Sequence, residues 1–194
     1  MVGSALITVG CALSSSGTGA SGTTSSTITA PASQTSLDKE ALSDFDRRVH
    51  RYMTLQDKLQ RQGTRQKQRA DVGENIVSRQ ALATRIRFAR HDSKQGDILG
   101  PPIAAALRRA MNPELRGDAA AGTRKSIREE APATFKLEVN GAYPEGASRS
   151  TMPGNVLAIL PVLPEGLEYR IVDTHLVLMD LDANIVVDYL LDVM

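Results

Sequence analysis

The sequence predicts an α+β protein: a helical region over residues 38–131, followed by a small antiparallel sheet with one short helix over residues 134–194. Two observations lead to this prediction. The last thirty or so residues hold three short runs rich in Leu, Val and Ile, with polar connections between them. The region before residue 131 places apolar side chains at steps of three and four. With 41% hydrophobic but only 4% aromatic residues and no Trp, we expect an aliphatic core.

The three runs predict an antiparallel meander, because the connections between them have hairpin length. The expected strands are Glu168–Val172, Leu176–Met179 and Ile185–Leu191. Upstream, Thr134–Asn140 alternates like a further strand, and residues 154–160 follow Pro153 as a short helix stopped by prolines.

Four helices are expected in the helical region. In residues 38–62 the apolar face is Leu42, Phe45, Val49, Tyr52 and Leu59, with Gln56 on the same face. A polar, basic connection over 60–73 then leads to a second helix at 74–91, and the two helices should form a hairpin. The third helix begins at Pro101 or Pro102 and ends near Met111, because Asn112-Pro113 should stop it. The fourth covers 117–130.

The N-terminal residues are typical of an exported bacterial protein. Residues 1–13 contain a short apolar run, Ala5–Gly10, directly before the single cysteine, Cys11. This is a signal-like or lipoprotein-like segment, and Cys11 is the candidate lipidated residue. Cleavage after a small residue in Ala12–Ser16 is the competing prediction. Residues 14–36 are rich in Ser, Thr, Gly and Ala and predict a disordered tether.

Charge is unevenly distributed along the chain. Residues 164–194 carry seven acidic residues against Arg170 alone, whereas the rest carries 22 Lys and Arg against 15 acidic residues. We expect the basic helices and the acidic sheet to attract each other within the molecule. Polyanion or nucleic-acid binding through the basic helices is the alternative, although acids are interleaved throughout and no nucleic-acid motif is present.

The sequence contains no convergent catalytic set, and it predicts no cofactor and no metal site. His50, His91 and His175 lack the spacing of a metal or catalytic pair. Asp180, Asp182 and Asn184 match the first ligands of a calcium loop, but Ile185 and Leu191 occupy the positions of its Gly and Glu. We therefore interpret this segment as a hairpin turn. Arg170, His175 and Asp180 are the cluster that an enzyme site between helices and sheet would use.

Residues 134–194 contain the motifs VNGAYPEG, STMP, LPVLPEGLEYRIV, HLVLMD and ANIVVDYL, and KQGDI lies at Lys94–Ile98. Taken together, these motifs resemble a family of exported proteins of soil bacteria to which no activity is assigned. The closing hairpin contains Tyr169-Arg170, Leu178–Asp180 and Ile185–Asp188. In this outline it is similar, more loosely, to small periplasmic proteins of the nickel/cobalt-homeostasis type. The histidine-rich stretches that could accompany metal handling are absent here, so this role is not carried over.

From these observations we expect an exported, periplasmic or membrane-anchored module of the cell envelope that is accessory or interacting rather than catalytic. Its expected partner is another envelope protein, and its contact with the membrane would run through a lipid on Cys11. A periplasmic enzyme is the first alternative, and polyanion binding is the second.

Overall fold

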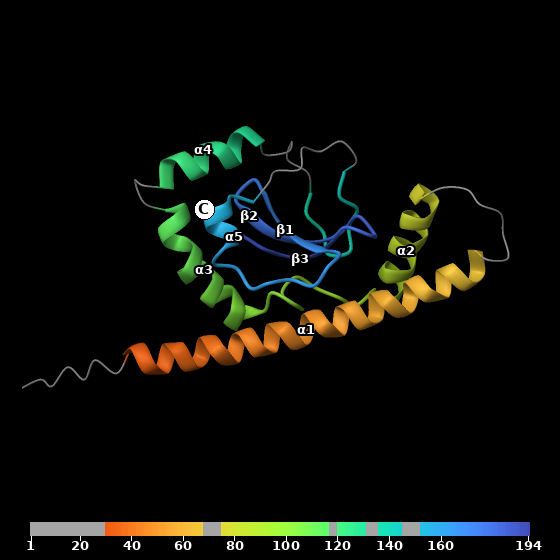
Figure 1. Ribbon diagram of the computed structural model, residues 1–194, viewed down its shortest axis with the longest axis horizontal. Helices are drawn as coiled ribbons and strands as arrows, with labels where there is room; N and C mark the ends of the chain where they lie inside the picture. Colours follow the sequence, from red (N-terminus) through yellow and green to blue (C-terminus); the bar gives the residue numbers. More distant parts are fainter. Residues whose placement is uncertain (1–29, 68–74, 117–119, 131–135, 145–151) are drawn as a thin grey trace, which may run out of the picture.

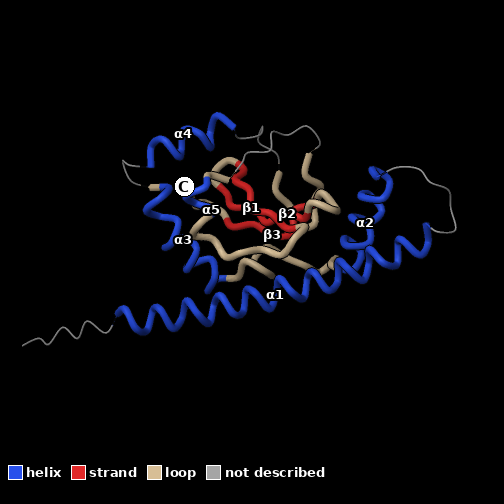
Figure 2. Tube along the Cα trace, in the orientation of Figure 1, coloured by secondary structure: helices blue, strands red, loops and turns tan. Residues whose placement is uncertain are grey.

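The computed structural model describes residues 30–67, 75–116, 120–130, 136–144 and 152–194, and it confirms the α+β class (Figure 1). A three-stranded sheet lies at the centre, and helices lie along one side of it and at both of its ends (Figure 2). The helices are α1 (Ala30–Lys67), α2 (Asn75–Ala89), α3 (Pro101–Leu115), α4 (Ala121–Glu130) and α5 (Gly154–Leu157). The strands are β1 (Leu167–Val172), β2 (His175–Asp180) and β3 (Ile185–Leu190).

The sheet is the predicted antiparallel meander, in the order β1-β2-β3. Two residues, Asp173 and Thr174, connect β1 to β2, and residues 181–184 connect β2 to β3. Asp173 and Asn184 have φ angles of 55° and 53°. Asp and Asn adopt this left-handed conformation more readily than other residues with side chains. The turn chemistry visible in the sequence therefore fixes both hairpins.

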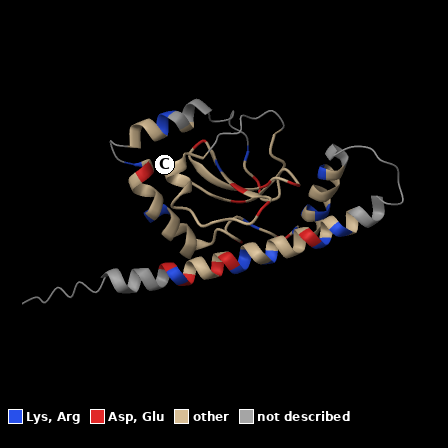
Figure 3. Ribbon diagram, viewed as in Figure 1, with Lys and Arg blue, Asp and Glu red and all other residues tan. Residues whose placement is uncertain are grey.

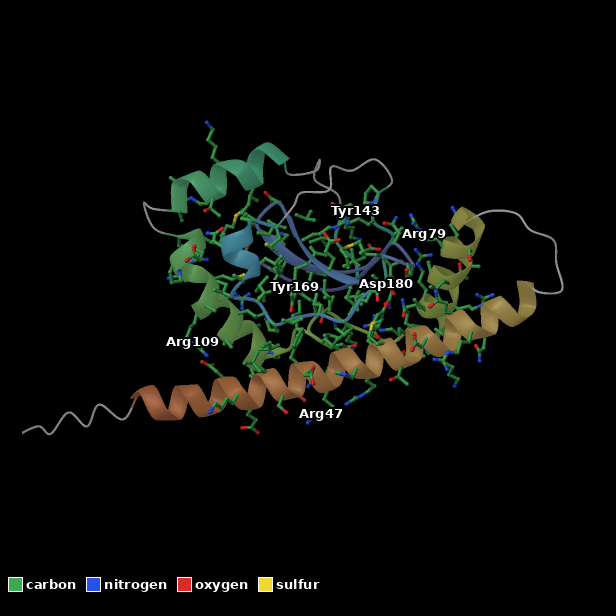
Figure 4. The ribbon with its side chains drawn as sticks, viewed as in Figure 1. Arg47, Arg79, Arg109, Tyr143, Tyr169 and Asp180 are labelled. Atoms are coloured by element: carbon green, nitrogen blue, oxygen red, sulfur yellow. The ribbon has the colours of Figure 1, made fainter. Side chains whose placement is uncertain are left out.

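Both faces of the sheet are buried. Side chains of one face, among them Tyr169 of β1, Leu178 of β2 and Val187 of β3, belong to the main core. This core also includes side chains of α1, α2, α3, α4 and α5. Residues of the opposite face, including Val177 and Met179, pack with Tyr143 from a covering segment over residues 136–144. We refer to this segment as the strap. In Figure 4, Tyr169 and Asp180 lie on the α1 side of the sheet, and Tyr143 lies on the other side.

Helix α1 is longer at both ends than the sequence analysis predicted. It begins at Ala30, so residues 30–36, assigned to the tether, are helical. Pro31 is the second residue of α1, where a missing N–H has no helical partner to lose. The residues assigned to the tether before Ala30, and the signal-like segment with Cys11, lie outside the described residues.

At its other end α1 continues to Lys67, through residues assigned to a connection. Once a helix has formed, each added residue gains one hydrogen bond, and the Gln, Arg and Lys residues here are good helix formers. Gly63 lies inside the helix, and the guanidinium of Arg85 from α2 packs against it, in the space that a Cβ atom would occupy. Helix α2 then rises steeply from α1 in Figure 1.

The other helices lie close to their predicted places, with one correction at α3. Asn112-Pro113 does not stop this helix, which ends at Leu115. Leu115 is fully buried, as is Met111 one turn earlier, so packing outweighs the hydrogen bond that Pro113 cannot make. Helix α5 is shorter than predicted, and residues 158–160 continue it as hydrogen-bonded turns.

The strand predicted at Thr134–Asn140 is absent from its described part. Residues 136–138 have no regular structure, and 139–140 form a turn with Asn140 at a φ of 62°. The strap instead meets the edge of β3 just beyond that turn. Asn140 N donates to Val186 O, Val186 N donates to Gly141 O, and Ala142 bridges Ile185. The left-handed turn at Asn140 therefore ends the extended segment that the alternating sequence pattern predicted as a strand.

Candidate functional site

Most of the charged and amide side chains that are buried in the described residues gather where α1, the end of α2 and the loop 91–100 meet the sheet. These side chains are Gln56, Arg90, Asn140, Asp180 and Asp188. Arg170 is also buried, but it lies on the strap side. Because burying a charged group is costly unless it is hydrogen-bonded, the partners of each of these groups explain how the junction is built.

The carboxylate of Asp188 on β3 holds the loop between α2 and α3. It is completely buried, and it accepts hydrogen bonds from the backbone N–H groups of Gly96 at 2.9 Å and of Ile98 and Leu99 at 2.8 Å. Its own neighbour, Tyr189 N, donates a fourth at 2.8 Å. Four charge-assisted hydrogen bonds replace the water that this carboxylate has lost. The loop, and with it the start of α3, is thereby fixed to the sheet.

Next to Asp188, β3 contains a β-bulge whose backbone carbonyl is bound by Arg90. Leu178 pairs with Asp188 and Met179 pairs with Val186, so Val187 has no cross-strand partner. The Arg90 guanidinium donates to Val187 O at 3.3 and 3.4 Å and to Asn140 Oδ1 at 2.9 Å. It also lies over the Tyr52 ring, 4.9 Å from its centre. Burial lowers the pKa of Arg90, and the tyrosine and nearby carboxylates oppose that shift.

Tyr52 connects α1 to the end of β2. Its hydroxyl donates to Asp180 Oδ2 at 2.6 Å, and Asp180 Oδ1 accepts from Ala183 N at 2.8 Å. Burial raises the pKa of Asp180, although both hydrogen bonds act to lower it. Burial also raises the pKa of Tyr52 well above its usual value, and Asp180 adds to that increase. One turn along α1, Gln56 Nε2 donates to Asp182 Oδ2 at 3.1 Å.

The basic helices and the acidic sheet, which were predicted to attract each other, are joined by hydrogen bonds to backbone groups. Among the described residues, no recorded ion pair joins an arginine of the helical region to a carboxylate of residues 164–194. Arginines instead bind backbone carbonyls: Arg90 that of Val187, Arg108 that of Leu191 and Arg116 that of Asp192. The acidic groups are bound by N–H groups, a tyrosine and a glutamine.

The structure does not bring together the three residues proposed for an enzyme site. Asp180 faces α1, whereas Arg170 lies on the opposite face with its guanidinium 5.0 Å from the centre of the Tyr143 ring. His175 is at the other end of β2 from Asp180, where its Nδ1 accepts from Asp192 N at 3.1 Å. These side chains cannot contact one substrate atom together.

The other residues considered from the sequence have local roles. His50 and His91 are exposed, with 69% and 72% of their side chains accessible. Residues 181–184 form the predicted hairpin turn, and Asn184 Nδ2 donates to Tyr143 O at 2.8 Å. Within the described ranges, no group of three or more His, Cys, Asp or Glu side chains is placed to hold a metal ion.

Several surface hollows border α1 in the described part of the chain, and two of them lie close to charged groups of other elements. One, of about 600 Å³ between α1 and α3, contains the ion pair of Arg109 with Asp38 and that of Arg47 with Asp44 (Figure 4). The other, of about 370 Å³, lies next to the buried junction, and we call it the arginine hollow. Its polar lining residues are Arg48, Arg51, Tyr52, Arg90, Ser93 and Asp97.

Comparison with known proteins identifies no relative: no protein-family model, no curated protein and no solved structure matches the chain. In the part of the chain that the structure describes, no helix has both the length and the apolar character needed to span a bilayer.

Sequence reasoning missed the central residues of this junction. Asp188 lies in a strand with no side-chain partner at a recognisable spacing, and it binds N–H groups about 90 positions away. Arg90 lies just beyond the end of α2, and nothing in its spacing distinguishes it from the other arginines of the basic helices. The signals that could have identified them are an acidic residue in an otherwise apolar strand and an arginine just beyond the end of a helix.

Replacing Asp188 should strongly destabilise the protein. In D188N one carboxylate oxygen becomes an NH2 group that faces N–H donors, so buried donors lose their acceptor. We expect the free energy of unfolding to fall by about 3 kcal/mol. Urea denaturation measures this, with D92N as the matched control because 90% of the Asp92 side chain is exposed. Equal unfolding midpoints for D188N and D92N would contradict the role assigned to Asp188.

Stability should depend on pH through Asp180. Because its pKa is raised in the folded state, folded protein binds this proton more tightly than the unfolded chain does. The resulting stabilisation is complete below the unfolded pKa of about 3.9 and is lost as the pH rises through the folded value. The free energy of unfolding of the native protein minus that of D180N should therefore decrease as the pH rises from about 4.

Denaturant titrations at a series of pH values measure this difference, and a difference that increases with pH would refute the prediction. D57N, at an exposed position, serves as the control.

Proposed function

We propose that this chain is an exported module of the bacterial cell envelope that acts by binding rather than by catalysis. The observation that carries the proposal is the use of the buried ionisable groups. Asp188 binds a loop backbone, Asp180 binds Tyr52 and a turn, and Arg90 completes a bulge. Groups bound in this way build a rigid scaffold. The envelope location is supported by the apolar run before Cys11 and by the Ser/Thr-rich tract that follows it.

The alternative of an enzyme site between helices and sheet is weakened, because the three residues proposed for that site lie apart. Arg170 and Asp180 lie on opposite faces of the sheet, and His175 lies at the far end of β2. We therefore do not assign a reaction to these residues.

The alternative of nucleic-acid binding through the basic helices is weakened by local ion pairing along α1. Asp44 pairs with Arg47 and Arg48, and Asp57 pairs with Arg61. Acidic and basic side chains alternate along this helix (Figure 3). Such pairing reduces the net positive field that a phosphate backbone would meet.

The proposal is tested by expressing the gene from its native upstream region in a bacterial host, followed by fractionation and intact-mass measurement. We expect a processed form outside the cytoplasm. If Cys11 is lipidated, the mature chain begins there and is membrane-bound, and C11S abolishes that association. If the chain is cleaved within Ala12–Ser16, it is soluble in the periplasm and C11S leaves its location unchanged. A cytoplasmic protein that retains Met1 would refute export.

A further inference from the structure

The arginine hollow is open to solvent directly beside the buried junction, and its lining is basic. Arg48, Arg51 and Arg90 line it against one carboxylate of the lining, Asp97, although Arg48 also pairs with Asp44 outside it. That carboxylate already accepts a hydrogen bond from Lys94 N at 2.9 Å. The volume of about 370 Å³ lies within the range of about 300–1,000 Å³ typical of small-molecule sites. The hollow therefore offers both space and positive charge to a small ligand.

Arg90, at the inner side of the hollow, has its positive charge balanced only at a distance. It is 9% exposed, and its recorded hydrogen bonds go to neutral oxygens, Asn140 Oδ1 and Val187 O. The neighbouring carboxylates of Asp180 and Asp188 are bound by other donors. A buried guanidinium without a direct carboxylate partner among the described residues favours an anion beside it.

Two further groups in the lining have hydrogen-bonding capacity to spare. Arg51 and the Ser93 hydroxyl make no recorded hydrogen bond or ion pair with other described residues. Arg48 uses Nε for Asp44 and one terminal nitrogen for the carbonyl of Asp97. The hollow thus combines a buried guanidinium, an exposed guanidinium and a hydroxyl, a donor set suited to several oxygens of one tetrahedral anion.

We propose that the arginine hollow binds an oxyanion of the phosphate class through Arg51, Ser93 and Arg90. This goes beyond the function proposed above and does not depend on it, because the same lining would bind phosphate in any compartment. Tyr52 does not contact the anion through its hydroxyl, which already donates to Asp180. It holds the Arg90 guanidinium in place through its ring. The phosphate group can belong to a small soluble compound or to a lipid headgroup.

Binding of the soluble form is measured by titrating the full-length C11S protein with pyrophosphate at low ionic strength, using amide chemical shifts in NMR. We expect saturable shifts of the backbone amides of Ser93, Asp97 and Ile98. The variant R51Q should bind about tenfold more weakly, the loss expected for one charge-assisted hydrogen bond. R61Q is the matched control, because Arg61 is also an exposed arginine of α1 but does not line the hollow.

The lipid form is measured by flotation of the same proteins with phosphatidylglycerol vesicles and, separately, with phosphatidylcholine vesicles. Binding of pyrophosphate without flotation would assign a soluble phosphate ligand. Flotation with phosphatidylglycerol alone, reduced in R51Q and retained in R61Q, would assign a lipid headgroup. The proposal is overturned if neither phosphate form binds, or if R51Q and R61Q weaken binding equally, since the second result indicates unspecific charge attraction. Neither result bears on export, which fractionation tests separately.

Discussion

Asp188 anchors the loop 96–99 to the sheet, and this contact positions the helices that pack against it. A β-strand and a loop that lie about 90 residues apart in sequence are joined through one carboxylate. The apolar side chains around it, such as Leu99 and Val187, would pack in many arrangements, because the hydrophobic effect has no direction. Hydrogen bonds to a buried charge are directional, so Asp188 restricts where the loop, and with it the start of α3, lies relative to the sheet.

The bulge in β3 links this anchor to the helices. The extra residue, Val187, presents a carbonyl that no neighbouring strand can bind, and Arg90 supplies its donors. The same guanidinium contacts Tyr52 of α1 and Asn140 of the strap. One arginine therefore joins four parts of the chain, and the same side chain lines the arginine hollow.

Most parts of the fold that depend on local sequence signals were predicted correctly, whereas the parts that depend on contacts between distant residues were not. The hairpins follow from short apolar runs and from Asp173 and Asn184, whose types suit left-handed turns. The helix start at Pro101 follows in the same way. The continuation of α3 past Pro113 depends on the packing of Met111 and Leu115, which spacing does not report. The extension of α1 to Lys67 runs through good helix formers that carry no apolar spacing. The acid in an apolar strand indicates that Asp188 is buried, but its partners could not be predicted, because they are backbone N–H groups, which have no sequence signature.

The buried junction should be as stable as the core. Native-state hydrogen exchange of the amides of Gly96, Ile98 and Leu99 measures its local stability. If Asp188 anchors the loop, these amides exchange only through global unfolding, with the same free energy as the buried amide of Val177 in the central strand. Exchange through local opening, at a much lower free energy than that of Val177, would contradict the account.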